Sequence, residues 1–272
     1  MKFRFPTIVF ILLVMFALTA MAQSPSPTPS PTATPTQLLS PKNPNTAVTA
    51  EQVVESSIFV YSLSGGRERL DQIRKTSVEL GKSKVTGANG RVDQATYTRF
   101  TLRGADLSKD KIRLDQVLPN ARFSLVTSGD KIALVFNNTV LTPSDEAASS
   151  FENTSYRGID GLLRYKESGS TLVLAGKEKE LGVEFYLIDV TDTKQRKTRF
   201  YVSVKSFRVM MLTYEEAGVK YKRKFYNYNY AQGTLVPYRT VLTANDKIIE
   251  ETDVGTITFG QKIDEEMFNV SL

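Results

Sequence analysis

The residues available for chemistry in this 272-residue chain are carboxylates, lysines, arginines and hydroxyls, because it contains no cysteine and no histidine. Without cysteine there is no thiol nucleophile, no disulfide and no cysteine-based metal site. Without histidine the chain lacks the commonest general base and the commonest zinc ligand. We therefore expect a protein that is not an enzyme and that uses no cofactor.

Two groups of acidic residues are candidates for catalysis or metal binding. The first grouping is Glu178, Glu180 and Glu184. Two of these carboxylates could pair as acid and base for glycoside chemistry, but ordinary surface charge is the interpretation we favour. The three aspartates within residues 106–115 are too scattered for a calcium loop, which needs ligands at alternate positions and a central glycine. No glycine-rich phosphate loop and no Gly-x-Ser-x-Gly elbow is present. The sequence predicts no catalytic and no metal-binding residue.

Residues 221–230 interleave basic and aromatic side chains, in the order Tyr-Lys-Arg-Lys-Phe-Tyr-Asn-Tyr-Asn-Tyr. Such a segment can stack bases and neutralise phosphate, or contact anionic lipid headgroups. A strand with one charged face and one aromatic face explains the same pattern. The net charge of +6 is mild and includes Lys2 and Arg4 near the N-terminus. Because each basic side chain is worth about 1 kcal/mol near an anionic membrane, this charge suits weak association with headgroups, and we expect no nucleic-acid partner.

The N-terminus has the features of an export signal. Lys2 and Arg4 precede an apolar run over residues 8–18, and Ala20-Met21-Ala22 then supplies the small-x-small pattern of a signal-peptidase site. The apolar run is shorter than the ~20 residues of a membrane span. The prediction is a signal peptide over residues 1–22 and a periplasmic or secreted protein. The alternative is an uncleaved leader that anchors the chain to the inner membrane.

Residues 23–47 alternate serine, threonine and proline, which predicts an extended, semi-rigid and disordered linker. Folded structure is then expected over residues 48–272. Thr49-Ala50-Glu51-Gln52 has the form of a capping box, and Val53, Val54, Ile58 and Tyr61 recur with helical spacing. A second short helix is expected from Arg67 to about Lys75.

From residue 76 the apolar period changes from helical to two, which predicts strands. Asn89-Gly90 marks a hairpin turn. Two helical segments interrupt the strands, one starting at residues 143–146 and one after Gly158. Asn153-Thr154-Ser155 fits the glycosylation pattern, which we interpret as a chance match. The order predicts an α+β fold with a single large antiparallel sheet, and so many strands must curl around something, for which the helices near 49–62 and 158–166 are the natural occupants.

Seven segments of the chain occur in an order that is typical of one family. They are Ala50-Glu51-Gln52-Val53-Val54, Gly65-Gly66-Arg67, Ser128-Gly129-Asp130-Lys131, Asp145-Glu146-Ala147-Ala148, Gly176-Lys177-Glu178 running to Gly182, Thr234-Leu235-Val236-Pro237-Tyr238-Arg239 and Ile263-Asp264-Glu265-Glu266-Met267-Phe268. In this order the chain resembles the LolA/LolB-like periplasmic carriers, especially the outer-membrane lipoprotein-sorting proteins, over roughly residues 48–270. The resemblance implies a half-open, incomplete β-barrel with helices packed in or over its concave face.

The same resemblance implies a monomeric envelope carrier that binds acyl chains of a lipoprotein or another lipid. A membrane surface or an envelope receptor protein would then be its partner. A membrane-tethered sensor or scaffold module of the same fold, which binds a partner protein, is the alternative. The carriers latch their helical lid with an arginine, and no arginine of this chain is aligned with it.

An acyl carrier needs an apolar cavity, because each CH₂ exposed to water costs about 0.8 kcal/mol. Apolar residues that alternate along the expected strands are the candidates for its lining. They are Leu134, Phe136, Tyr186, Ile188, Phe200, Val202, Met211 and Phe225. Ordinary packing of a sheet on helices is the competing explanation for each of them.

Overall fold

The fold is known from a computed structural model, which describes residues 47–87, 90–128 and 131–270. The predicted signal peptide, nearly all of the predicted linker and Asn89 of the predicted turn lie outside these residues. The helices are α1 (Ala50–Tyr61), α2 (Gly66–Ile73), α3 (Asp145–Tyr156) and α4 (Ile159–Leu163), with short 3₁₀ turns η1 (Leu107–Lys109) and η2 (Glu265–Phe268). The strands are β1 (Thr76–Thr86), β2 (Val92–Leu102), β3 (Lys111–Leu118), β4 (Ala121–Ser128), β5 (Lys131–Phe136), β6 (Thr139–Leu141), β7 (Thr171–Glu180), β8 (Val183–Thr191), β9 (Lys197–Ser203), β10 (Val209–Glu216), β11 (Val219–Ala231), β12 (Thr234–Ala244) and β13 (Lys247–Phe259).

All of these strands belong to one antiparallel sheet with the order β6-β5-β4-β3-β2-β1-β13-β12-β11-β10-β9-β8-β7. The sheet therefore consists of two meanders, β1–β6 and β7–β13, which are joined where β1 pairs with β13. The edge strands β6 and β7 are consecutive in the chain, and α3 and α4 connect them. The connection must cross from one edge of the sheet to the other.

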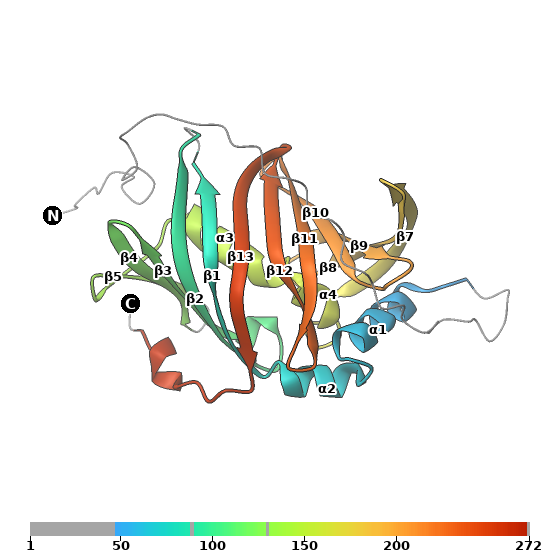
Figure 1. Cartoon of the computed structure of the whole chain (residues 1–272), viewed down its shortest axis with the longest axis horizontal. Coiled ribbons are helices and arrows are strands. Elements are labelled where there is room, and N and C mark those ends of the chain that lie inside the picture. The colour runs from blue at the N-terminus through green and yellow to red at the C-terminus, as the bar shows by residue number, and fades with distance from the viewer. Residues whose placement is uncertain (1–46, 88–89, 129–130, 271–272) are drawn as a thin grey trace.

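The sheet is curved, and α3 and α4 cross its hollow side, behind the central strands in Figure 1. The helices α1 and α2 lie at one end of the strands. The two edges do not pair, so the barrel is incomplete. This confirms the predicted α+β class with one large curved sheet and helices in its hollow.

The first helix forms as its sequence predicts. The Thr49 hydroxyl accepts a hydrogen bond from the Gln52 backbone, and the Gln52 side chain accepts one from the Thr49 backbone, which completes the capping box. Val53, Val54 and Ile58 are fully buried on one side of the helix. That side packs into the main core.

The main core lies between the helices α1 and α4 and one face of β8–β12, here called the inner face of the sheet. Its fully buried members include Leu162 of α4, Ile188 of β8, Phe200 of β9 and Leu212 of β10. A second, smaller core lies at the other end of the sheet, where Phe151 of α3 packs on β3–β5. The two ends of the hollow are therefore filled unequally.

The opposite, outer face of the sheet is partly covered by the C-terminal segment. The η2 turn contacts β3 and β4, and the Arg113 guanidinium of β3 donates to the Met267 carbonyl at 2.9 Å. Phe268 is buried there, and the outer-facing Val126 and Ala133 are fully buried. This segment shields the outer face behind the smaller core.

Candidate functional site

The helix α3 is the element that covers the less filled half of the hollow. Ser144 caps it, accepting a hydrogen bond from the Ala147 backbone at 3.2 Å, and Asp145 and Glu146 in the first turn suit the positive end of the helix dipole. Only Phe151 and Asn153 of its twelve residues are buried. Because so little of α3 is buried, few apolar contacts hold it on the sheet.

Phe151 is the apolar anchor of α3. It packs with Ile112, Leu125 and Leu134 of β3–β5, and Leu114, Phe123 and Ile132 lie around them, half-buried. The register pairs Leu114 with Leu125 and Leu125 with Leu134, so these side chains share the inner face. A strip of six apolar side chains thus crosses three strands under a single aromatic ring from α3.

The other side of α3 is fastened to the end of β10 by polar contacts. The Glu216 carboxylate accepts hydrogen bonds from the Asn153 amide at 2.6 Å and from the Ser149 hydroxyl at 3.3 Å. Asn153 is the residue that matched the glycosylation pattern. Its buried, hydrogen-bonded side chain is unsuited to carrying a glycan, in agreement with a chance match.

The β8–β9 turn holds α3 from a third direction. Glu152 accepts from Lys194 and from Arg196, each at 2.9 Å. The Arg196 guanidinium also lies over the ring of Tyr156, 4.0 Å from its centre. These contacts between α3 and the β7–β13 meander are therefore mainly ionic and polar.

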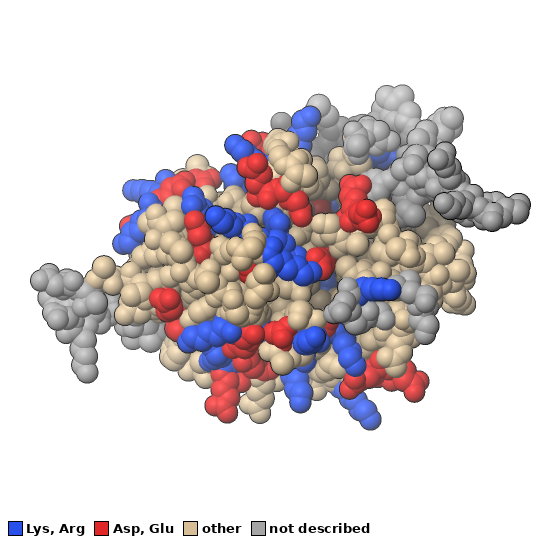
Figure 2. All heavy atoms as spheres, turned by 180° about the vertical axis from the view of Figure 1, so that it is seen from behind, with Lys and Arg blue, Asp and Glu red and all other residues tan. Residues whose placement is uncertain are grey.

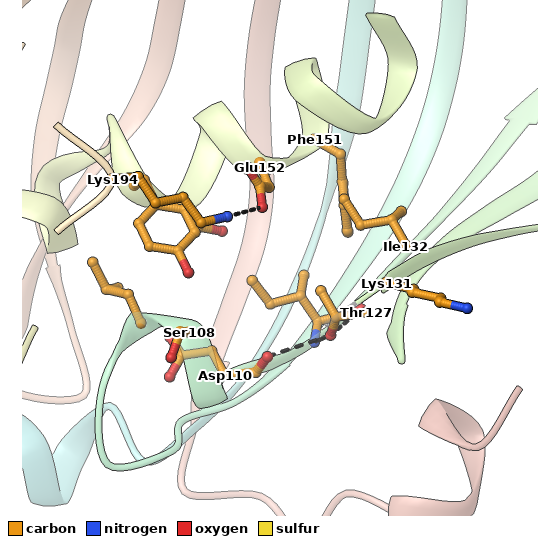
Figure 3. A pocket seen from close by; sticks show the side chains of 12 residues that line it. Ser108, Asp110, Thr127, Lys131, Ile132, Phe151, Glu152 and Lys194 are labelled. Carbon is orange, nitrogen blue, oxygen red and sulfur yellow. Dashed lines mark hydrogen bonds and ion pairs between the residues drawn. The ribbon is translucent and has the colours of Figure 1, made fainter. Parts of the chain in front are cut away.

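A cavity of about 230 Å³ lies between α3 and the sheet. Figure 3 shows Phe151 and Glu152 above it, Ile132 and Thr127 beside it, and Ser108 and Asp110 below. Lys194 reaches toward Glu152 across its rim, and Lys131 points away from it. Leu107, Ser155 and Tyr156 also line the cavity, whose lining thus combines apolar side chains with hydroxyls and the buried carboxylate of Asp110.

This cavity is smaller than the ~300–1,000 Å³ of typical ligand pockets. In the form described here the helices fill most of the hollow. On the helix side, seen in Figure 2, Lys and Arg alternate with Asp and Glu, with no large area of one sign. The mouth of the hollow therefore has no strong preference for charge of either sign.

An ion-pair cluster borders the cavity where α4 meets the sheet. The Asp160 carboxylate of α4 accepts from Arg74 at 2.9 Å and from Arg103 at 2.5 Å. Arg164, the residue that follows α4, donates to Asp110 at 2.7 Å, and both side chains are buried. Burial acts to raise the pKa of Asp160, but Arg103, Arg74 and Arg164 outweigh it and hold that pKa well below its usual range.

Asp110 behaves differently from Asp160. Burial raises the pKa of Asp110, although Arg164 and the Gly104 backbone amide act in the opposite direction.

Arg74 also donates to the Leu235 carbonyl at 2.7 Å and to the Thr234 hydroxyl at 2.8 Å. The cluster therefore ties α4 both to the end of α2 and to the start of β12.

Seven of the eight residues predicted to line a cavity lie on the inner face. Tyr186, Ile188, Phe200, Val202 and Phe225 are in the main core against α1 and α4. Leu134 is in the smaller core, and Phe136, at the end of β5, is 38% exposed. None of the seven is among the residues that line the cavity under α3.

Met211 lies on the outer face. A register shift between Val209 and Met211 places Met211 opposite Tyr201, in a small cluster with Phe185 and Leu187. A bulge of this kind changes the side to which every following residue points. Among the residues described, no group of three or more acidic side chains could hold a metal ion, and no helix has the length and apolar character to cross a membrane.

The residues that shape the cavity most directly were not among those predicted. Phe151, Glu152 and Tyr156 lie on a helix with only a weak apolar pattern, and Lys194 lies in a turn. The sequence feature that could have indicated this contact is Phe151, the apolar residue nearest the middle of that helix.

An incomplete antiparallel barrel with helices across its hollow is the architecture of LolA-like proteins. A LolA superfamily protein from Nitrosomonas europaea is similar in structure, with a TM-score of 0.58 and 12% sequence identity over 82% of this chain and 99% of that one. A DUF1329 family protein from Desulfovibrio piger has the same TM-score, with 11% identity over 82% of this chain and 98% of that one.

No protein-family model matches the chain, and no curated protein matches its sequence. At identities this low, the structural similarity establishes the fold alone. The chain has a LolA-like fold, as the order of its sequence segments predicts.

Proposed function

We propose that this protein is a non-enzymatic envelope carrier that holds the acyl chains of a lipoprotein or another lipid in the hollow of its sheet. The observation that supports this most strongly is the attachment of α3. One apolar side chain, Phe151, anchors α3 over an apolar strip on β3–β5, and the remaining described contacts are polar. Such a helix can be displaced without unfolding the sheet.

The energies favour exchange of α3 for a lipid. Withdrawing one Phe side chain from a core costs about 2–3 kcal/mol, and exposed ion pairs such as Glu152–Lys194 are worth about 0–1 kcal/mol each. Burying one CH₂ contributes about 0.8 kcal/mol. Roughly four methylenes on the exposed strip would offset the loss of Phe151. Further methylenes of a longer chain would offset the hydrogen bonds that Glu216 accepts from α3, which are worth about 1.5–3 kcal/mol each.

The carrier would act outside the cytoplasm as a monomer. The signal peptide predicted over residues 1–22 supports this location. Cargo would be passed to a membrane surface or an envelope receptor, and the mixed charge on the helix side suits brief contact with either.

The test combines two measurements on the protein purified from its host envelope. Native mass spectrometry detects a co-purifying lipid, and an uncharged naphthylamine probe that fluoresces in apolar surroundings reports binding in the hollow. We expect a bound lipid, and displacement of the probe by dodecanoate. The variant Ile132→Trp, which fills the cavity, should weaken probe binding at least fivefold.

The matched control is Ile248→Trp, because Ile248 is 50% exposed on β13 and lies away from the cavity. This variant should bind the probe as the unchanged protein does. Absence of any lipid, together with absence of displacement, would reject the carrier function.

A further inference from the structure

Arg157 is a buried arginine whose charge is poorly matched by its surroundings. It is the residue after the last turn of α3, and its side chain is 5% exposed. Its Nε and Nη1 atoms have no hydrogen-bond partner, and its Nη2 is 3.7 Å from the Glu216 carboxylate, too far for a hydrogen bond. Buried guanidinium groups are normally fully paired.

The position of the guanidinium is fixed although its donors are unused. Its central carbon lies 4.1 Å from the centre of the Tyr214 ring on the inner face of β10. Stacking of this kind fixes the plane of the group. The residues before it, Ser155 and Tyr156, line the cavity, whereas Arg157 itself does not. Because its Nε and Nη1 donors are buried as well as unpaired, a bidentate contact with a ligand requires α3 to move first.

The charges around Tyr214 do not balance. Burial raises the pKa of Tyr214 to about 12, and the charged groups that act on it most are the cations Arg223 and Arg157 and the anion Glu216. Glu216 already accepts hydrogen bonds from Asn153 and Ser149. Arg157 and Arg223 thus have Glu216 as a common nearby carboxylate, and that carboxylate already accepts two hydrogen bonds from α3.

We propose that Arg157 binds the acidic head of the carried lipid, so that the cargo is an anionic single-chain amphiphile whose tail lies along the apolar strip of β3–β5. This inference rests on the carrier function proposed above. The head is a carboxylate or a phosphate, since both offer paired oxygens to the edge of a guanidinium. A neutral acyl compound of the same length is bound more weakly, because it leaves the donors of Arg157 unpaired.

The experiment compares three ligands of one chain length, namely dodecanoate, dodecyl phosphate and dodecanol, as competitors of the uncharged probe. One of the two anions should displace the probe at a concentration about tenfold below that of dodecanol, because a hydrogen bond to a charged group is worth roughly a factor of ten or more. The stronger of the two identifies the head. In Arg157→Gln the anion should lose this advantage while dodecanol binds as before, and Arg157→Lys should keep part of it.

The control is Arg199→Gln, which removes an outer-face arginine that is paired with Asp189 at 2.6 Å. It should keep the preference for the anion, and circular dichroism checks that each variant is folded. Equal displacement by all three ligands, or an unchanged preference in Arg157→Gln, overturns the role of Arg157 and leaves the carrier function standing. Failure of every ligand to displace the probe, together with the absence of a co-purifying lipid, rejects both.

Discussion

Asp160 is the residue on which the junction of helix and sheet depends most. Its carboxylate joins Arg74 at the end of α2 to Arg103 at the end of β2. Asp160→Asn removes the charge that both arginines face, and Arg74 is itself buried. We expect a loss of about 2–4 kcal/mol in the free energy of unfolding at neutral pH, measured by urea denaturation.

The same variant should change how stability depends on pH. Because the folded pKa of Asp160 lies below its unfolded value of about 3.9, its contribution is complete above pH ~4–5 and is lost as the pH falls toward the folded pKa. Asp110 and Asp71, whose pKa values are raised by burial, act in the opposite direction in both proteins. The difference between the two stability curves should therefore shrink on acidification, and a constant difference would contradict the ionic role of Asp160.

At the level of single residues, the sequence predicts the side of the sheet for some side chains and not for others. Alternation along strands placed Ile188, Phe200 and Phe225 on the helix side, because apolar burial and strand period coincide there. The bulge before Met211 has no local signature in the sequence, so its side was not predictable. The partners of Asp160 lie 86 and 57 residues away in the chain, and pairings at that distance exist only once the sheet has formed.

At the scale of elements, α3 is the one whose attachment can be weakened selectively. Glu216→Gln removes the charge from the hydrogen bonds that Asn153 and Ser149 donate. Charge-assisted hydrogen bonds are about twice as strong as neutral ones. The backbone amides of α3 should then exchange with deuterium about tenfold faster, as measured by hydrogen-exchange mass spectrometry. The global free energy of unfolding, measured by urea denaturation, should change by less than about 1 kcal/mol.

The neighbouring residue provides the control for this prediction. Glu215 is exposed and points to the other side of β10, opposite Lys220. Glu215→Gln should leave exchange in α3 unchanged. If both variants speed exchange equally, the effect comes from the charge of the strand end rather than from the fastening of α3.

The elements themselves were largely predictable. The capping box placed the start of α1, and the period-two segments placed most of the strands within a few residues. The pairing of β1 with β13 was not predictable, since it joins segments about 170 residues apart and neither strand specifies its partner. Nor does the sequence between β6 and β7 show that α3 would rest on a single aromatic anchor.

For the whole molecule, the unequal filling of the two ends predicts unequal local stability. The end built by β8–β12 shares the large core with α1 and α4, whereas the inner face of β3–β5 contributes to a core of four buried apolar residues, one of them Phe151 from α3. Regions with few buried apolar contacts open locally at lower free energy than the rest of a fold. Amides of β5 should accordingly exchange before those of β9 and β10.

A bound acyl anion should reduce the difference in exchange rate between the two ends of the sheet. A ligand that binds only the folded state stabilises it by about 2.7 kcal/mol at a concentration 100 times its Kd. The amides closest to the ligand should gain most of the protection. Dodecanoate should thus slow exchange in β3–β5 more than in β9 and β10. Dodecanol at the same degree of saturation is the control for burial of the chain alone, and it should protect the same strands. Protection of β8–β12 only would place the ligand in the main core between α1, α4 and the sheet, and would show that the hollow opens at the other end.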